Sequence, residues 1–356
     1  MSSTRRLATQ VGLPALFLVA TMAIMCGCSR DAKHASGPAL SDVFIAGEDD
    51  YVAFRIPGLL AFRGILFAFA EGRKYGCGDF SGQHNIVLKR STDGGHAWSN
   101  LSVLLDPLAM FGKVACGNVS SATSSCEFWD PTPIADSITG EVLLMTSRSW
   151  SVNSRMNGQM DQWLLRSSDL GLTWGAPENI TSQVWSDSHH LMTPGNGHAT
   201  QLSDGRLLFP GYVRLGSDAL SSCAVIYSDD HGRSWHFGEN SLIGGATSEC
   251  EVVELQHSTP PHSRLLMDAR RSEGTCGEGV SHCRWRSYSN DKGLTWGPLE
   301  AVPALPDPVC AAGIVAWPRQ QALLFTNAAT TSGRVNITLK MSLDDGQTWP
   351  HSQVWP

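Results

Sequence analysis

Short apolar runs alternate with turn-forming residues along the chain, and the turns repeat one pattern. The pattern S-x-D-x-G-x-x-W occurs five times, with starting residues 76, 61, 61 and 53 positions apart. The five copies begin at Ser91, Ser167, Ser228, Ser289 and Ser342. Each copy follows an apolar run, and its Asp-x-Gly core favours a tight turn because Gly readily adopts positive φ. We therefore predict a hairpin at each copy, with the Trp folded back to bury its ring.

A second apolar segment lies about twenty residues before each turn. These segments cover residues 65–67, 143–145, 207–209, 265–267 and 323–325. Two features that recur together indicate a repeated unit of several antiparallel strands rather than one hairpin that happens to recur. Long runs with helical period are absent from the sequence. The pattern predicts an all-β fold of the β-propeller type.

The N-terminal segment has the layout of a secretory signal peptide. Arg5 and Arg6 precede an apolar stretch at residues 11–25, and the small or polar residues 26–29 follow. We therefore expect a signal peptide at residues 1–29. A membrane anchor and a lipid-modified Cys28 are the alternatives, although the apolar stretch is shorter than the ~20 residues that span a bilayer.

Charge and cysteine content limit which partners and which cellular compartment we expect for the chain. The formal net charge is −7, which gives no reason to expect nucleic acid or an anionic membrane surface as a partner. Eight cysteines follow the predicted signal peptide, and an even count is typical of disulfides in an oxidising compartment. The pairs nearest in sequence are Cys116/Cys126 and Cys276/Cys283. Sequons compatible with glycosylation in such a compartment lie at Asn100, Asn118, Asn179 and Asn336.

Several common chemistries lack their motifs here. The twelve His residues have no Cys, His or carboxylate partners at metal-ligand spacing, so we expect neither a metal nor another cofactor. The sequence contains no G-x-S-x-G nucleophile elbow and no phosphate-binding loop. Residues 112–125 are rich in Gly, Ser and Ala, and they predict a long loop.

Candidate chemistry begins with F-R-I-P at residues 54–57. Because Pro57 cannot donate a hydrogen bond to a strand ladder, we expect the strand to break there and to turn Arg55 out of the sheet. Downstream, A-E-G-R-K at residues 70–74 ends the next apolar strand, and Asp79 follows in a loop rich in Gly and Ser.

These motifs, together with the five repeated turns, resemble the sialidases (neuraminidases) that contain Asp boxes, most closely the lysosomal and bacterial members. The segments S-E-C at 248–250, D-A-R at 268–270 and G-R-V-N at 333–336 extend the resemblance. It covers residues 42–356, which we expect to form one catalytic domain. The resemblance implies a six-bladed β-propeller, with an incomplete last blade here, and we call the repeated turns Asp boxes.

The resemblance also implies three arginines that bind the carboxylate of sialic acid. Arginine suits this task because its planar, permanently charged guanidinium meets both oxygens of a carboxylate. The matching positions are Arg55, Arg270 and Arg334, which lie on different repeats. Repeats of a propeller converge on its axis, so residues far apart in sequence are expected to meet at one mouth.

The substrate carboxylate accounts for the nucleophile that the resemblance implies. A carboxylate nucleophile would be repelled by it, whereas a neutral Tyr is not, and the Tyr needs a nearby carboxylate to take its proton. Glu249 matches that carboxylate. Asp79 matches the acid/base group that protonates the departing oxygen and then activates water. Arg73 matches a further substrate-binding arginine.

The chain departs from the family pattern at the nucleophile. In the family, the catalytic Tyr follows the fifth Asp box in a G-Y-S type segment, and this sequence reaches Pro356 before such a segment. No tyrosine of the chain has that context; the five are Tyr51, Tyr75, Tyr212, Tyr227 and Tyr288. We therefore expect a C-terminally truncated sialidase.

Neighbouring residues compete for two of these roles. Arg271 is an alternative to Arg270. For Arg334, the alternative is that its side chain is simply solvated on a strand and binds no ligand. Glu251 and Glu254 are alternatives to Glu249.

Structural roles compete for other positions. Arg73 could simply pair with Glu71, and Asp79 could serve only its Gly-rich turn. We assign the Asp-box aspartates to structure, on the outer part of each blade. Asp130 falls where relatives have a pocket residue, and we leave it outside the core set.

The sequence thus predicts an exo-α-sialidase that removes terminal sialic acid from glycoproteins, gangliosides and oligosaccharides. A catalytically inactive sialic-acid-binding propeller and a trans-sialidase are the alternatives. The expected setting is the secretory pathway, with a lysosomal, extracellular or membrane-associated location. Membrane association would come from a glycolipid substrate or from an uncleaved N-terminal segment.

Overall fold

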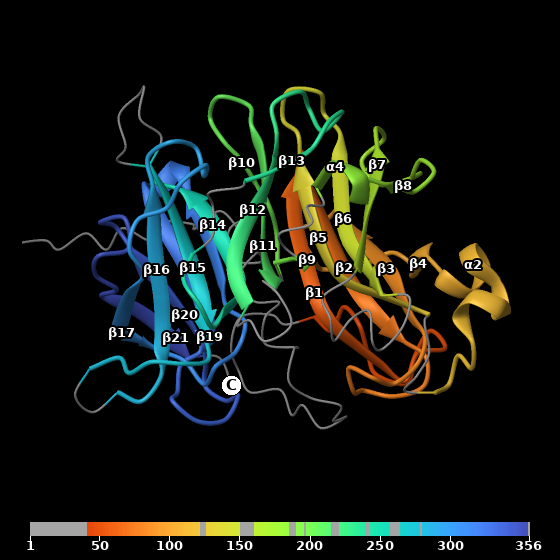
Figure 1. The fold of residues 1–356 in the computed structure, drawn as a ribbon, viewed down its shortest axis with the longest axis horizontal. Coiled ribbons are helices and arrows are strands. Elements are labelled where there is room, and N and C mark those ends of the chain that lie inside the picture. The colour runs from red at the N-terminus through yellow and green to blue at the C-terminus, as the bar shows by residue number, and fades with distance from the viewer. Residues whose placement is uncertain are drawn as a thin grey trace, which may run out of the picture.

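Strands dominate the computed structural model of the chain (Figure 1). The structure describes residues 41–121, 126–149, 160–184, 190–195, 197–214, 221–238, 243–256, 264–277 and 280–354. The predicted signal peptide lies outside these residues. Helices are few and short: α2 (Pro107–Cys116), α4 (Thr181–Val184) and the 3-10 turn η2 (Pro318–Gln320). The prediction of an all-β fold is confirmed.

The described strands form four sheets, which comprise five antiparallel groups of strands that follow one another along the chain, and we call these groups blades 1 to 5. Blade 1 contains β1 (Ala53–Phe62), β2 (Ile65–Arg73), β3 (His84–Ser91) and β4 (Ser102–Leu105). Blade 2 contains β5 (Glu127–Ala135), β6 (Val142–Ser149), β7 (Met160–Ser167) and β8 (Glu178–Asn179). A single parallel pair, His84 with Glu127, joins these two blades into one sheet.

The other three blades repeat the same order of strands. Blade 3 contains β9 (His190–Pro194), β10 (Thr200–Gln201), β11 (Leu207–Arg214), β12 (Ser221–Ser228) and β13 (His236–Phe237). Strands β9 and β10 both pair with β11, so together they take the place of the first strand in this blade. Blade 4 contains β14 (Thr247–Glu254), β15 (Leu265–Arg271), β16 (Cys283–Ser289) and β17 (Glu300–Pro306). Blade 5 contains β18 (Gly313–Trp317), β19 (Ala322–Ala328), β20 (Ile337–Ser342) and β21 (His351–Val354). The described residues form these five blades, and the six-bladed arrangement stays a prediction.

Each Asp box is the turn that leads from the third to the fourth strand of its blade, as predicted. In every copy the Ser hydroxyl donates to the Asp carboxylate at 2.7–2.8 Å. The same hydroxyl accepts the N–H of the Gly at 2.7–2.9 Å, and that Gly has a φ of 74–91°. The second predicted apolar segment lies in the second strand of each blade. Both periodic features of the sequence therefore belong to one repeating blade.

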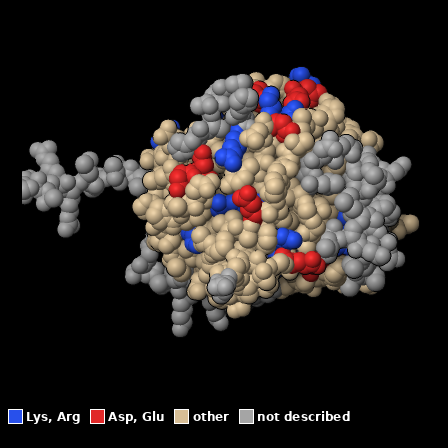
Figure 2. Space-filling model, turned by 60° about the vertical axis from the view of Figure 1, so that its left-hand side comes forward, with Lys and Arg blue, Asp and Glu red and all other residues tan. Residues whose placement is uncertain are grey.

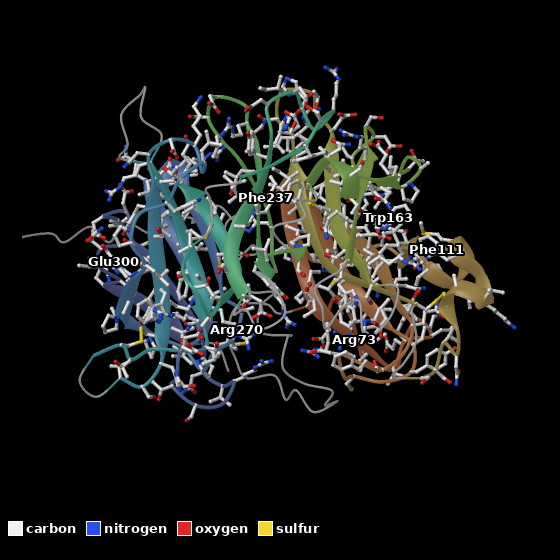
Figure 3. The ribbon with its side chains drawn as sticks, in the orientation of Figure 1. Arg73, Phe111, Trp163, Phe237, Arg270 and Glu300 are labelled. Carbon is white, nitrogen blue, oxygen red and sulfur yellow. A yellow bond between two sulfur atoms is a disulfide. The ribbon has the colours of Figure 1, made fainter. Side chains whose placement is uncertain are left out.

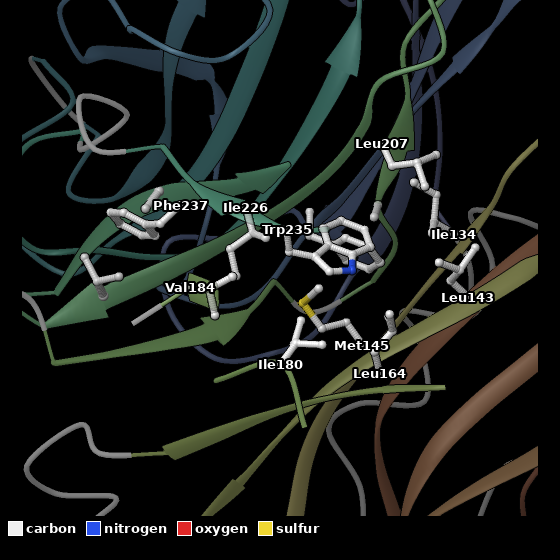
Figure 4. Packing of buried hydrophobic residues seen from close by; sticks show 14 residues of the cluster. Ile134, Leu143, Met145, Leu164, Ile180, Val184, Leu207, Ile226, Trp235 and Phe237 are labelled. Carbon is white, nitrogen blue, oxygen red and sulfur yellow. The ribbon is translucent and has the colours of Figure 1, made fainter. Parts of the chain in front are cut away.

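Apolar side chains pack between neighbouring blades. Figure 4 shows such a cluster between blades 2 and 3, where the ring of Trp235 is 2% exposed and lies 5.3 Å from the ring of Phe209. Blade 2 contributes Leu143, Met145 and Leu164 to this cluster. Trp235 thus buries its ring, as predicted, at a joint between blades, whereas the other four Asp-box Trp residues are only half-buried.

Arginines add a polar contact at three of these joints. In each case a guanidinium of one blade donates to a backbone carbonyl in the Asp box of the next blade, where it satisfies an acceptor that the turn leaves unpaired. The contacts run from Arg166 to His231 and Gly232, from Arg206 to Lys292, and from Arg286 to Gly346. The Asp boxes therefore fasten one blade to the next.

Helix α2 occupies part of the segment that the sequence predicts to be a loop. The side chain of Asp106 caps the helix by accepting two backbone N–H groups at 2.9 and 3.1 Å, and Pro107 begins the helix. The helix bends at Gly112 and continues to Cys116. The prediction of a loop is wrong for residues 112–116, because a well-capped helix of ten residues has too little period to stand out in the sequence.

Between described residues, two disulfides join the cysteine pairs that are nearest in sequence, a pairing that the sequence alone left open. They are Cys116–Cys126 and Cys276–Cys283, with Cα atoms 4.7 and 5.9 Å apart. Three other cysteines, Cys223, Cys250 and Cys310, are buried thiols. The four sequon asparagines are all exposed.

The surface carries both signs of charge. On the face drawn in Figure 2, basic and acidic side chains are interspersed, without a broad region of one sign. Within the described ranges, no helix has the length and apolar character needed to cross a membrane.

Candidate active site

Bulges in the first strands of three blades shape one pocket. The pairing register shifts at Ile56 in β1, at Asp130 in β5 and at Glu249 in β14. These three residues have positive φ values of 52°, 53° and 33°, and all three line the same pocket. Positive φ is unfavourable for residues with a Cβ, and such positions concentrate at functional sites. Strand β1 continues through Pro57, so the predicted break at this residue is wrong and a bulge takes its place.

The pocket has a volume of about 160 Å³ and a highly charged lining. Its charged residues are Arg55, Arg73, Asp79, Asp130, Glu249, Arg270 and Arg334. Blades 1, 2, 4 and 5 supply them, and Figure 3 shows Arg73 and Arg270 on the same side of the molecule in opposite halves of the view. The six residues predicted for the site therefore line a single cavity, together with Asp130.

Asp79 lies between two arginines of blade 1. Its Oδ1 is 2.6 Å from Nη1 of Arg55 and 3.0 Å from Nη1 of Arg73. Both guanidinium groups also donate to the carbonyl of Cys77, at 3.4 and 2.9 Å. The Asp79 side chain is 45% exposed, so it faces the open pocket while these cations hold it.

Behind this network, a buried carboxylate fixes Arg73. Oε2 of Glu71 accepts from Nε and Nη2 of Arg73 at 3.0 and 2.6 Å, and both side chains are 0% exposed. Oε1 of Glu71 accepts the backbone N–H of Asp130 at 3.0 Å. Burial lowers the pKa of Arg73, but the charges and hydrogen bonds of Glu71 and Asp79 outweigh it, so the net pKa is raised. Arg73 pairs with Glu71 and also reaches the pocket.

On the opposite side of the pocket, Arg270 forms a close ion pair with Glu249. Both residues lie next to the bulge in β14, on neighbouring strands, because Ser248 pairs with Arg270. The competing residues have other partners. Arg271 stacks on Trp285 with 4.1 Å between its Cζ atom and the ring centroid.

The two competing glutamates also point elsewhere. Glu251 accepts the N–H of Ile314 at 2.7 Å, and Glu254 accepts from Ser203 at 2.8 Å. Glu249 is therefore the carboxylate of β14 that lines the pocket.

The sequence reasoning did not select several other pocket residues. Asp130 was set aside, and Tyr212 on β11 carries no motif, yet both line the cavity. Trp129, Cys310 and Ala311 complete part of the wall. The W-D-P sequence at residues 129–131 is the one available signal, since Pro in a strand marks a bulge or an edge.

The arrangement suits a small anion that also carries hydroxyl groups. Four guanidinium groups and three carboxylates surround the cavity, so an anionic ligand gains paired hydrogen bonds from arginine while the carboxylates accept from hydroxyls. Asp79 and Glu249 stand on opposite walls, which allows one to exchange a proton with a ligand and the other to assist a neutral nucleophile.

Comparison with known proteins places the chain in a family. A family model described as a BNR repeat-like domain matches residues 64–355. The sialidase of Bacteroides fragilis is 31% identical over 331 residues, which are 87% of this chain and 56% of that protein. The chain belongs to the BNR-repeat sialidase family. The sialidase of Micromonospora viridifaciens is 31% identical over 88% of this chain and 48% of its own length.

The solved structures of this family share the fold. The Hadza microbial sialidase Hz136 superposes with a TM-score of 0.75 and 29% identity, covering 87% of this chain and 60% of that one. The intramolecular trans-sialidase of Ruminococcus gnavus has the same fold at a TM-score of 0.67 and 19% identity. The chain is an all-β propeller of the sialidase type, and it spans about half the length of these two curated relatives.

Proposed function

We propose that this chain provides the substrate site of an exo-α-sialidase, which hydrolyses terminal sialic acid from glycoproteins, gangliosides or oligosaccharides. One observation carries the proposal: Arg55, Arg270 and Arg334 come from blades 1, 4 and 5, respectively, and line one cavity. Three permanently charged side chains around a small pocket match a sugar that bears a carboxylate on its anomeric carbon.

Asp79 is proposed to act as the acid/base group. Asp79 pairs with Arg55 at 2.6 Å. A substrate carboxylate that binds Arg55 would replace this contact and place a negative charge near Asp79. Both changes favour the protonated carboxyl, which is the form that donates a proton to the departing glycosidic oxygen.

Glu249 is proposed to take the proton of a Tyr nucleophile. The close pair with Arg270 holds its carboxylate at the pocket wall, on the side opposite Asp79. The family resemblance implies a Tyr that follows the fifth Asp box, and Tyr212 is a tyrosine that lines the cavity. A neutral phenol avoids the repulsion that a carboxylate nucleophile would meet beside the substrate carboxylate.

Release of methylumbelliferone from its α-sialoside tests the proposal. We expect turnover by this chain, or by the same chain extended until a Tyr follows the fifth Asp box, and a loss of turnover in Asp79→Ala of whichever form is active. The matched control is Asp344→Ala, an Asp-box variant in blade 5, which should keep activity at a temperature where it is folded. If neither form binds or hydrolyses the sialoside, the proposal is wrong.

Two other outcomes correspond to the alternative functions. Binding of the sialoside without turnover in either form would favour a sialic-acid-binding propeller that retains the arginines. Transfer of the sugar to added lactose, at the expense of free sialic acid, would favour a trans-sialidase. Hydrolysis or transfer of sialic acid on glycoproteins or gangliosides agrees with a secretory or lysosomal setting. The predicted signal peptide and the disulfides support this setting.

A further inference from the structure

A fully buried arginine lies behind the pocket and contacts none of the space in which a ligand would bind. Arg284, on β16, is 0% exposed. Its Nε donates to Oδ2 of Asp268 at 2.8 Å, and its Nη1 donates to the backbone carbonyl of Cys310 at 2.6 Å. Asp268 precedes Arg270 by two residues on β15, so the two side chains lie on the same face of that strand. Arg284 thereby touches both the strand of Arg270 and the wall at Cys310.

The segment that Arg284 holds is the connection from β17 to β18. This connection includes Cys310 and Ala311, which line the pocket. Asp307, 2% exposed, begins the turn, accepts the N–H of Cys310 at 2.9 Å and lies 3.6 Å from Nη1 of Arg284. Asn327 adds a second clamp, because its Nδ2 donates to the carbonyl of Pro306 at 2.8 Å and to Asp307 at 3.2 Å. The wall is thus fixed from behind by buried polar groups.

Arg284 also interacts electrostatically with Glu249, which lines the pocket. Burial lowers the pKa of Arg284, but the carboxylates of Asp268, Asp307 and Glu249 raise it more, so the net shift is upward. The carboxylate of Glu249, a pocket residue, thus contributes to keeping this buried arginine protonated. A buried cation with such partners does not lose its proton at any ordinary pH.

We propose that Arg284 is a positioning residue of the sialic-acid pocket: it holds the Cys310–Ala311 wall against the Glu249–Arg270 side at the separation that the ligand needs. The inference rests on the proposed function for the identity of the ligand. The geometric part of the inference, that Arg284 fixes the wall at Cys310 and Ala311, is independent of the ligand. A lysine at this position keeps the charge but has no planar fork, so it cannot hold Asp268 and the Cys310 carbonyl at the same time.

The first measurement is the affinity of the full chain for DANA, an unsaturated sialic acid analogue, by isothermal titration calorimetry. In Arg284→Lys we expect the Kd to rise about tenfold or more, because small displacements of a binding wall weaken ligand contacts steeply. The matched control is Arg286→Lys. Arg286 lies two residues along the same strand, is 4% exposed, and donates to Gly346 of an Asp box instead of the pocket wall. This control should lose stability but keep its Kd within about twofold.

The second measurement does not need a ligand. Cys310 is 6% exposed in the pocket wall, whereas Cys223 and Cys250 are 0% exposed. Alkylation with iodoacetamide, followed by peptide mapping, reports on the wall through Cys310 and on global unfolding through the other two thiols. In Arg284→Lys we expect alkylation of Cys310 to become about tenfold faster while Cys223 and Cys250 stay protected, as for local opening of one segment.

The outcomes separate the two proposals. If neither this chain nor its extended form binds DANA, the proposed function fails, and the rate of Cys310 alkylation still tests the role of Arg284. If Arg284→Lys does not fold, Asp307→Asn tests the same wall, and the same faster alkylation of Cys310 is expected. The inference is wrong if Cys310 reacts at the wild-type rate in a folded variant, or if the Kd of Arg284→Lys changes no more than that of Arg286→Lys.

Discussion

Glu71 illustrates how one buried carboxylate organises several pocket groups. It pairs with Arg73 through one oxygen and accepts the backbone N–H of Asp130 through the other. His84 lies 3.8 Å away from the same carboxylate. A buried ion pair contributes little net stability, but loss of one partner leaves a charge without compensation. Glu71 therefore fixes two pocket positions without lining the pocket itself.

Glu71→Gln is expected to destabilise the fold. The neutral amide leaves the guanidinium of Arg73 less compensated inside the protein, and we expect a decrease of about 3 kcal/mol in the free energy of unfolding. Urea unfolding followed by tryptophan fluorescence measures it. The control is Glu178→Gln, which removes the exposed partner of Arg166 and should cost about 0.5 kcal/mol or less. If both variants lose the same free energy of unfolding, burial of the Glu71–Arg73 pair does not make its disruption more costly than that of an exposed pair.

Arg270→Ala is expected to remove ligand binding and leave the fold intact. The side chain is 26% exposed and its charge serves Glu249 and the pocket. Truncation of one partner of a desolvated charge contact costs about 2–5 kcal/mol of binding, so the Kd for DANA should rise at least about thirtyfold. Calorimetric titration measures this change. The neighbouring variant Arg271→Ala removes a stacking contact with Trp285 and should bind as wild type does.

A melting temperature tells a structural arginine from a ligand-binding one. We expect Arg270→Ala to melt within a few degrees of wild type. A collapse of the melting temperature would mean that Arg270 serves the fold, and the ligand role would then be lost.

At the residue scale, the sequence predicts the positions that short motifs mark. Arg55, Arg270 and Arg334 follow from F-R-I-P, D-A-R and G-R-V-N, and they line one cavity. Tyr212 and Cys310 line it as well, but no local pattern marks them. Their approach to the pocket depends on how strand β11 and the β17–β18 connection pack against other blades, and this packing is not encoded within a few neighbouring residues.

At the scale of elements, the Asp box is a unit of hydrogen bonds. In blade 3, the carboxylate of Asp230 accepts the backbone N–H of Ser234 at 2.9 Å and the hydroxyls of Ser228 and Ser234 at 2.8 and 2.6 Å. Burial raises the pKa of Asp230, but these hydrogen bonds lower it more, and the pKa is held at about 2. The same turn receives the guanidinium of Arg166 from blade 2. The ionised carboxylate thus stabilises a turn and a joint together.

Asp230→Ala should lower the melting temperature in a pH-dependent way. A carboxyl with a lowered pKa in the folded state stabilises the protein above its unfolded pKa of about 3.9, and this contribution is lost as the pH falls toward 2. The difference in melting temperature between wild type and variant should therefore be largest near neutral pH and shrink below pH 4. Calorimetric scans across this range measure it. Asp230→Asn, which keeps an acceptor without the charge, should recover part of the stability but show a weaker pH dependence.

The sequence predicts the hairpins and second strands well because each has its own period or turn chemistry. It does not predict the bulges at Ile56, Asp130 and Glu249, because a bulge is a property of the pairing between two strands. The sequence indicated a disturbance at Pro57, but the strand continues past it. Helix α2 was missed because its capping by Asp106 is a signal of only a few residues.

At the scale of the whole molecule, a pair formed by a buried glutamate and a half-buried histidine joins three blades. Glu251 of blade 4 accepts the N–H of Ile314 in blade 5, and its Oε2 lies 3.5 Å from Nδ1 of His198, which follows β9 of blade 3. The chain passes very close at this point, since a Cβ on Gly197 would lie 1.7 Å from Oε1 of Glu251. Burial lowers the pKa of His198, but Glu251 raises it more, so the net pKa is above its usual value.

This pair predicts that acid pH tightens the contact between blades. A histidine with a raised pKa in the folded state stabilises the protein fully below its unfolded pKa of about 6.5, and the contribution is lost as the pH rises through the higher folded value. The melting temperature of wild type minus that of His198→Gln should therefore be larger at pH 5.5 than at pH 8.5. Scanning calorimetry in matched salt measures the difference. If the difference in melting temperature between wild type and variant is independent of pH, or larger at alkaline pH, the proposed role of the His198–Glu251 pair is wrong.

The bulges in β1, β5 and β14 have a consequence for how this molecule tolerates change. Each inserted residue stands outside the alternation of its strand, so its side chain can be exchanged without turning any neighbour from the interior to the solvent. At these three positions, the side chain that lines the pocket is independent of the alternation that places its neighbours in the core. A substitution at Ile56, Asp130 or Glu249 therefore changes the lining of the pocket while the pairing register of the surrounding strands stays the same.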